Sequence, residues 1–159
     1  KFEHYERTLL GRELAPQRIE ELGQRFASLV VEEVVASDAI GGSLALLERL
    51  SARRTPCYVV SGTPEDELRV IVERRGMSHF FRDVRGSPAE KGDLLQALCA
   101  RAGHRPQHCI MVGDALGDYT AARAAGMGFL GVVSAGLASP FPPGTQTVRS
   151  FENDFEPAG

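Results

Sequence analysis

The sequence predicts an α/β fold built around a parallel sheet. Short apolar runs of four to six residues alternate with amphipathic helical patterns, and short loops join them. The chain has 159 residues, of which 43% are hydrophobic and 25% are charged, as in a soluble globular protein with a core of its own. No apolar run approaches the roughly 20 residues that a membrane-spanning helix needs.

The alternation can be followed from one end of the chain to the other. Two helical patterns come first, and the second carries Ile19, Leu22, Phe26 and Val30 on one stripe. The later elements are bounded by glycine and proline, and the tail from Ala135 reads as irregular. The predicted helices cover residues 1–10, 16–36, 41–54, 64–76, 88–103 and 117–126, and the predicted strands cover 56–62, 80–86, 108–113 and 128–133.

Charge and cysteine content narrow the class of protein. The net charge of −3 argues against a nucleic-acid-binding surface and against an anionic membrane partner. Cys57, Cys99 and Cys109 are odd in number and form no CxxC pair, so we expect buried free thiols and a cytoplasmic location. The four histidines show no metal-ligand spacing and are interpreted as surface or structural residues.

Six polar or glycine positions follow the predicted strands, where ligands of a doubly wound sheet bind. Three of them end the strand over 56–62, one lies near the start of the helix over 88–103, and two flank the start of the helix over 117–126. These positions are Ser61, Gly62, Thr63, Lys91, Asp114 and Asp118. A hydroxyl, an ammonium and free N–H groups suit a phosphate, and paired carboxylates suit Mg²⁺, which shares phosphate oxygens.

Each of these residues also has a local interpretation. Ser61 and Thr63 could cap the helix that starts at Pro64, and Lys91 could be a surface lysine. Asp114 and Asp118 could cap a helix and interact with its dipole. Their occurrence together, in this order and at three element ends, favours one shared site.

Three segments carry a family resemblance: "VVSGTP", "SPAEKGDLL" and "VGDALGDYTAARAAG" resemble motifs II, III and IV of the haloacid dehalogenase superfamily, in its phosphoglycolate phosphatase and β-phosphoglucomutase branch. The match runs from about Gly41 to Val133. The resemblance implies that Ser61, helped by the Gly62 backbone, binds the transferring phosphoryl group and that Lys91 neutralises phosphate and nucleophile charge. It further implies that Asp114 ligates Mg²⁺ and that Asp118 ligates the ion or supports it through water or Lys91.

The resemblance also implies a domain organisation. Residues 1–38 resemble the last part of an α-helical cap, and residues 39–159 resemble a Rossmann-like three-layer core. Motif I of the family, DxDx[TV], supplies the aspartate nucleophile, yet none of the seven aspartates has DxD spacing after an apolar strand. We therefore expect that a leading segment, the central strand of the sheet, is absent from this sequence.

The expected function is that of a Mg²⁺-dependent phosphatase. It would act on a small phosphorylated metabolite through an aspartyl-phosphate intermediate, with the nucleophile outside these 159 residues. A catalytically inactive module that binds a phosphorylated ligand or a partner is the alternative from another class. Phosphomutase and dehalogenase chemistry are the alternatives within the family.

Overall fold

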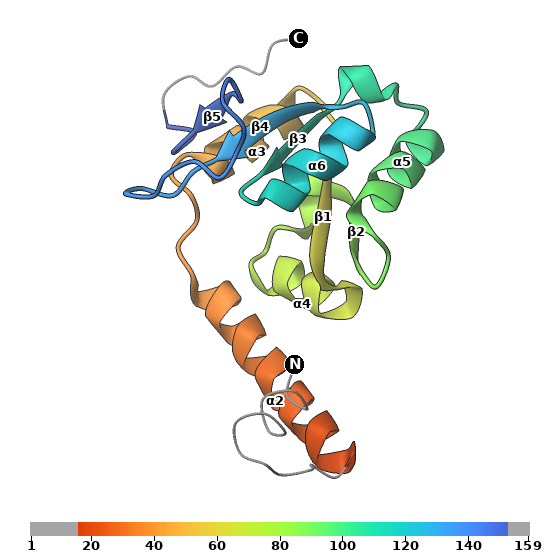
Figure 1. The fold of residues 1–159 in the computed structure, drawn as a ribbon, viewed down its shortest axis with the longest axis vertical. Coiled ribbons are helices and arrows are strands. Elements are labelled where there is room, and N and C mark those ends of the chain that lie inside the picture. The colour runs from red at the N-terminus through yellow and green to blue at the C-terminus, as the bar shows by residue number, and fades with distance from the viewer. Residues whose placement is uncertain (1–15, 153–159) are drawn as a thin grey trace.

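Strands and helices alternate along residues 16–152, which are the residues that the computed structural model describes (Figure 1). The predicted α/β class is confirmed, while the helix predicted over 1–10 lies outside the described residues. The helices are α2 (Pro16–Ala36), α3 (Ser43–Ala52), α4 (Glu65–Arg74), α5 (Lys91–Ala102) and α6 (Leu116–Ala124), with short 3₁₀ turns η2 (Ser78–Phe80) and η3 (Pro106–His108). The strands are β1 (Cys57–Pro64), β2 (Phe81–Ser87), β3 (Ile110–Gly113), β4 (Gly128–Val132) and β5 (Thr147–Val148).

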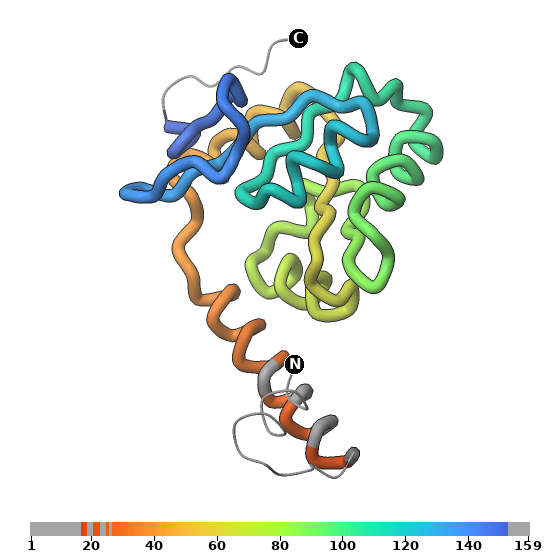
Figure 2. The backbone as a smooth tube through the Cα atoms, in the orientation of Figure 1, coloured from red at the N-terminus to blue at the C-terminus, as the bar shows by residue number. Residues whose placement is uncertain are grey.

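The strands form two parallel sheets. One sheet pairs β1 with β2, with Val59 opposite Val84, and the other has the order β3-β4-β5, with Met111 opposite Phe129. Figure 2 traces how the chain leaves β2, runs through α5 and enters β3. Among the described residues, no strand joins β1 to β3, so each of these two strands has one unpaired edge. The sheet is divided where the missing central strand was expected.

Helices α5 and α6 connect the two sheets through one apolar cluster. Alanines on α6 let that helix approach the sheet closely, and Val60 of β1 packs against the same cluster as Met111 of β3. Both sheets therefore share one packing layer although their strands do not pair. The buried members of the cluster are Leu95, Cys99, Met111, Ala121, Ala122, Ala125 and Met127.

The other face of the β3-β4-β5 sheet is covered only in part. Leu46 of α3 packs against Leu130, Val132 and Phe151 on that face. Ile110 and Val112 lie on the same face, because Val112 is in register with Leu130, but they remain 47% and 46% exposed. Apolar side chains of β3, the strand whose edge toward β1 is unpaired, therefore remain half exposed.

The tail departs from the prediction. It was expected to be irregular, but β5 pairs with β4 through Val132 and Val148. A two-residue strand is too short to show an alternating pattern, and its pairing is set by contact with β4.

Strand β1 is also longer than predicted, because its pairing with β2 continues to Pro64, opposite Ser87.

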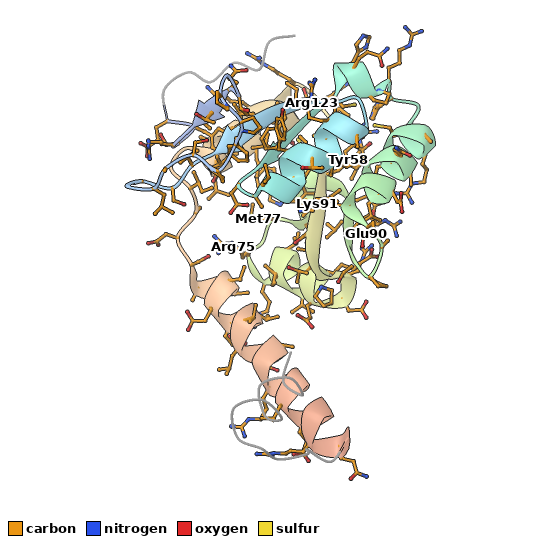
Figure 3. All side chains as sticks on the ribbon, in the orientation of Figure 1. Tyr58, Arg75, Met77, Glu90, Lys91 and Arg123 are labelled. Atoms are coloured by element: carbon orange, nitrogen blue, oxygen red, sulfur yellow. The ribbon has the colours of Figure 1, made fainter. Side chains whose placement is uncertain are left out.

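Helix α2 projects from the body of the structure and is attached at its C-terminal end (Figures 1 and 3). Arg75 donates hydrogen bonds to the carbonyl oxygens of Val34 and Ser37, at 2.7 and 2.8 Å. The guanidinium thus satisfies carbonyls that a helix end leaves free and complements the negative end of the helix dipole. On the predicted stripe, Leu22 and Val30 are half-buried, and Ile19 and Phe26 lie outside the described side chains.

None of the helices within residues 16–152 has both the length and the apolar character required to traverse a lipid bilayer.

Candidate active site

The site centres on an ion pair between two helix starts. Lys91, labelled in Figure 3, is the first residue of α5. Its Nζ atom donates to Oδ1 of Asp118 in the first turn of α6. Asp118 is 5% exposed and is the one buried charged side chain in the described part of the chain. A carboxylate removed from water needs such a partner, so the ammonium of Lys91 compensates its charge directly.

Lysine at this position stands out in the composition. Lys91 is the only lysine within residues 16–152, where every other permanent cation is an arginine. An ammonium is a compact point charge on a flexible stem, whereas a guanidinium is a wide planar group. The small head of lysine suits a position between a buried carboxylate and a second anion.

Asp118 also belongs to the backbone turn that starts α6. Its Oδ2 atom accepts a hydrogen bond from the N–H of Ala115 at 3.1 Å. A side chain on Gly113 would place its Cβ 2.5 Å from the Asp118 Oδ2 atom, so only glycine leaves room for this carboxylate. The local capping interpretation of Asp118 is therefore correct, and the same residue also makes the long-range pair with Lys91.

Asp114 lies at the carboxyl end of β3 and is exposed. Within the described residues no hydrogen bond or ion pair engages its carboxylate, in contrast to Asp118. Its place between β3 and α6 puts it four residues from Asp118 and at the edge where the strand ends. This carboxylate is available to a cation or to solvent.

Ser61 and Thr63 form a turn within the last part of β1. The Ser61 Oγ atom accepts from the Thr63 N–H at 3.1 Å and donates to Thr63 Oγ1 at 3.1 Å. Neither side chain caps α4, since Pro64 occupies the N-cap position without a side-chain hydrogen bond. The capping interpretation of these two residues is wrong. The structure forms the Lys91–Asp118 pair but makes no hydrogen bond from Ser61 to it.

Gly62 lies between these two residues with its backbone accessible. It is exposed, and nothing lies within 4 Å of where a side chain would begin. The turn therefore offers the exposed Gly62 backbone beside the Ser61 hydroxyl, a combination that suits an anion.

Sequence reasoning missed two residues, Glu65 and Gly86, that lie against this turn. Gly86, near the end of β2, donates its N–H to the Glu65 Oε2 atom at 3.2 Å. A Cβ on Gly86 would lie 2.3 Å from the carbonyl oxygen of Thr63, so the two strand ends touch through backbone atoms. A glycine closing a strand pattern was the only signal in the sequence.

Arginines surround the Glu65 carboxylate. The hydrogen bond from Arg69, followed by the N–H of Gly86 and the charge of Arg85, holds the pKa of Glu65 below its ordinary value. Arg85 also donates to Asp83 at 3.0 Å, which extends the ion pairs along β2. This network supports the strand ends and leaves Lys91 as the cation of the site.

The donor set fits Mg²⁺ better than a metal that needs a full protein cage. Within the described residues, no group of three His, Cys, Asp or Glu side chains could hold a metal ion. Asp114 and Asp118 provide two carboxylates, and Mg²⁺ is commonly bound by one or two carboxylates, waters and phosphate oxygens. These residues could therefore hold the metal ion only together with waters and with oxygens of a bound phosphate.

Comparison with known proteins places these observations in a family. The model of the haloacid dehalogenase-like hydrolases matches residues 2–126. Over 128 residues the chain is 27% identical to a phosphoglycolate phosphatase of Pasteurella multocida, covering 77% of this chain and 57% of that protein. It is 31% identical over 111 residues to a phosphoglycolate phosphatase of Rhodospirillum rubrum, covering 67% of this chain and 46% of the relative. The chain thus spans about half the length of these curated relatives.

Solved structures show the same fold. A crystal structure of a predicted phosphoglycolate phosphatase from Haemophilus somnus superposes with a TM-score of 0.76 at 20% sequence identity, covering 94% of this chain and 71% of that one.

Proposed function

Because the chain belongs to the haloacid dehalogenase-like hydrolases, we propose that it forms the phosphate- and metal-binding part of a Mg²⁺-dependent phosphatase. The observation that carries the proposal is the pairing of Lys91 with the buried Asp118, beside the exposed Asp114. A cation and two carboxylates at neighbouring helix starts suit a phosphate together with a divalent metal.

In this proposal the groups of the site divide between binding the phosphate and binding the metal ion. Lys91 balances the charge of the phosphate while it stays paired with Asp118. The hydroxyl of Ser61 and the N–H of Gly62 hold phosphoryl oxygens. Asp114 ligates Mg²⁺, and Asp118 ligates it or positions Lys91 and a ligating water. When bound, the metal ion supplies positive charge against the phosphate and the attacking carboxylate.

The nucleophile is proposed to be an aspartate on a strand between β1 and β3. Such a strand would pair with both open edges, and its carboxyl end would lie between Ser61 and Asp114. Its carboxylate oxygen would attack phosphorus while the bond to the leaving alkoxide breaks, and water would then hydrolyse the aspartyl phosphate. Ser61 is not proposed as the nucleophile, because it hydrogen-bonds only within its own turn and has no adjacent base.

We further propose that residues 1–38 are the end of a helical cap and residues 39–159 the core. The projection of α2 from the body supports this division (Figure 1). A cap over the carboxyl ends of the strands would select the substrate.

The proposed substrate is a small phosphorylated metabolite such as phosphoglycolate, since the two relatives described above are phosphoglycolate phosphatases. The test is phosphate release by the full-length protein from phosphoglycolate and from a panel of phosphomonoesters, with Mg²⁺ and after chelation. Metal-dependent release supports the proposal. Binding of vanadate without turnover of any ester would instead indicate an inactive binding module. Release of halide, or movement of phosphate between sugar hydroxyls, would indicate a dehalogenase or a phosphomutase.

A further inference from the structure

Two cysteine thiols lie in contact where α5 and β3 come together. Cys99 is on α5 and Cys109 directly precedes β3, and their Sγ atoms are 3.8 Å apart. Cys99 is buried at 6% exposure, while Cys109 is half-buried and packs against the same apolar cluster. The side chains thus meet at the edge of the core, with one sulfur closer to solvent than the other.

The backbone holds both residues in place. The carbonyl of Cys99 accepts the N–H of His104, and that of Cys109 accepts the N–H of Gly128, each at 2.9 Å. The N–H of Cys109 donates to the carbonyl oxygen of Pro106, in the connecting turn, at 2.9 Å. The thiol contact is therefore set by α5, η3 and the β3-β4 pair together. Since a disulfide has an S–S length of about 2.05 Å, small side-chain rotations would need to bring the sulfurs closer.

We propose that Cys99 and Cys109 are a redox-responsive pair that a peroxide converts to a disulfide joining α5 to β3. The more exposed Cys109 reacts first: its thiolate attacks one peroxide oxygen, the O–O bond breaks, and a sulfenic acid and hydroxide form. The Cys99 thiol then loses its proton, attacks the Cys109 sulfur and displaces hydroxide. The two sulfurs lose two electrons in total, and hydrogen peroxide is reduced to two waters.

The burial of Cys99 fits this order of events. Burial, followed by the neighbouring Cys109, raises the pKa of the Cys99 thiol to about 11. A thiol in that state reacts poorly with peroxide in solution but can still attack an oxidised sulfur in contact with it. The disulfide would close a ring over residues 99–109, which restricts the unfolded chain.

The bond would also tie together two elements that carry the candidate site. Helix α5 starts at Lys91, and β3 ends at Gly113, directly before Asp114. We expect oxidation to raise the melting temperature by about 5 °C or more, in a manner that a reducing agent reverses. The inference rests on the thiol geometry and holds whether or not the phosphatase proposal is correct.

The test uses the purified full-length protein, treated with hydrogen peroxide, blocked with an alkylating agent and digested with trypsin without reduction. Trypsin cleaves after Lys91, Arg101 and Arg123 but not before Pro106, so the two cysteines fall in separate peptides, residues 92–101 and 102–123. The expected result is a cross-link of these two peptides that dithiothreitol removes. Cys57, in the peptide 55–69, is the internal control and is expected to stay unlinked.

Variants make the result specific. C57A should keep the cross-link and the reversible rise in melting temperature, whereas C99A and C109A should lose both. C109A alters the half-buried position and therefore disturbs the core less than C99A, which alters a buried one. Irreversible oxidation of Cys109 to the sulfinic acid with no cross-link would overturn the proposal. The same holds if C109A shows the same peroxide-induced rise in melting temperature as the unmodified sequence.

Discussion

Lys91 and Asp118, 27 positions apart in the chain, form an ion pair that joins the start of α5 to the start of α6. The carboxylate is buried, while the lysine side chain is 25% exposed. The pair therefore presents a partly accessible ammonium whose position is fixed by a carboxylate beneath it. The first prediction tests this relationship.

Replacement of Lys91 by alanine is expected to lower the free energy of unfolding by about 2 kcal/mol, because Asp118 is left buried without its cation. The same substitution should cost much less when Asp118 is already asparagine, so the double-mutant cycle should show clear coupling. K91R is expected to lose nearly as much stability as K91A, since the guanidinium is wider than the ammonium that it replaces. Urea unfolding measures all of these values. Equal costs of K91A in both backgrounds would contradict the pairing.

Replacement of Asp114 by asparagine should abolish Mg²⁺-dependent phosphatase activity in the full-length protein while leaving its stability within about 0.5 kcal/mol. Asp114 is exposed and its carboxylate has no hydrogen bond or ion pair with a described residue, so we expect the fold not to depend on it. Asp93→Asn, at an exposed position of α5, is the matched control and should retain activity. Steady-state hydrolysis of p-nitrophenyl phosphate provides the measurement. Unchanged turnover in D114N would remove Asp114 from the proposed mechanism.

Gly113→Ala is expected to destabilise the protein by about 1–3 kcal/mol, because the new Cβ would lie 2.5 Å from the Asp118 carboxylate. Gly117→Ala is the matched control four residues away: it lies in α6 with nothing within 4 Å of a new Cβ. Since alanine favours a helix over glycine, G117A should be neutral or stabilising. In thermal unfolding, G113A should therefore lower the melting temperature clearly, whereas G117A should leave it unchanged or raise it.

The positions of the main elements could be predicted from the sequence, because apolar runs and glycine boundaries mark them. The run before Gly113 and the alanine-rich segment after it correspond to β3 and α6. The two residues of β5 carry no pattern of their own, since their structure depends on a partner strand distant in the chain.

The sequence could nominate the residues of the candidate site, which stay a prediction, but it could not give the contacts among them. The family resemblance indicated that Asp118 could act through Lys91, and the structure forms that pair. Spacing alone could not show it, because an ion pair across several elements depends on tertiary packing. The same limit explains why the role of Gly86 was missed: its closeness to Thr63 arises only when two strand ends meet.

Low pH should reduce the stability of the folded protein because Glu65 loses its charge. The pKa of this carboxyl is lowered in the folded state, chiefly by the hydrogen bond from Arg69. The ionised carboxylate therefore contributes stability above its ordinary pKa of 4.5, and that contribution is lost as the pH falls through the lower, folded pKa. E65Q should lower the melting temperature at pH 7 and reduce its further fall between pH 5 and pH 3. Glu67→Gln, in the same helical turn, is the control and should preserve that fall.

The last prediction concerns the open edges of β1 and β3. The described residues provide a turn that we propose binds phosphate, a lysine and two carboxylates, but no carboxylate on a strand between these edges. We therefore expect the 159-residue chain by itself to show no phosphatase turnover. It should also associate, because Ile110 and Val112 are half exposed beside the unpaired edge of β3.

A longer chain that adds a leading apolar strand ending in Asp-x-Asp should recover a monomer-sized, soluble protein and Mg²⁺-dependent hydrolysis. The control is the same longer chain with the first of these aspartates changed to asparagine. It should elute like the active form in size-exclusion chromatography yet hydrolyse no p-nitrophenyl phosphate, because the strand restores the sheet and only the carboxylate supplies the nucleophile. Strong metal-dependent turnover by the 159 residues alone would place the nucleophile within this chain and refute the assignment.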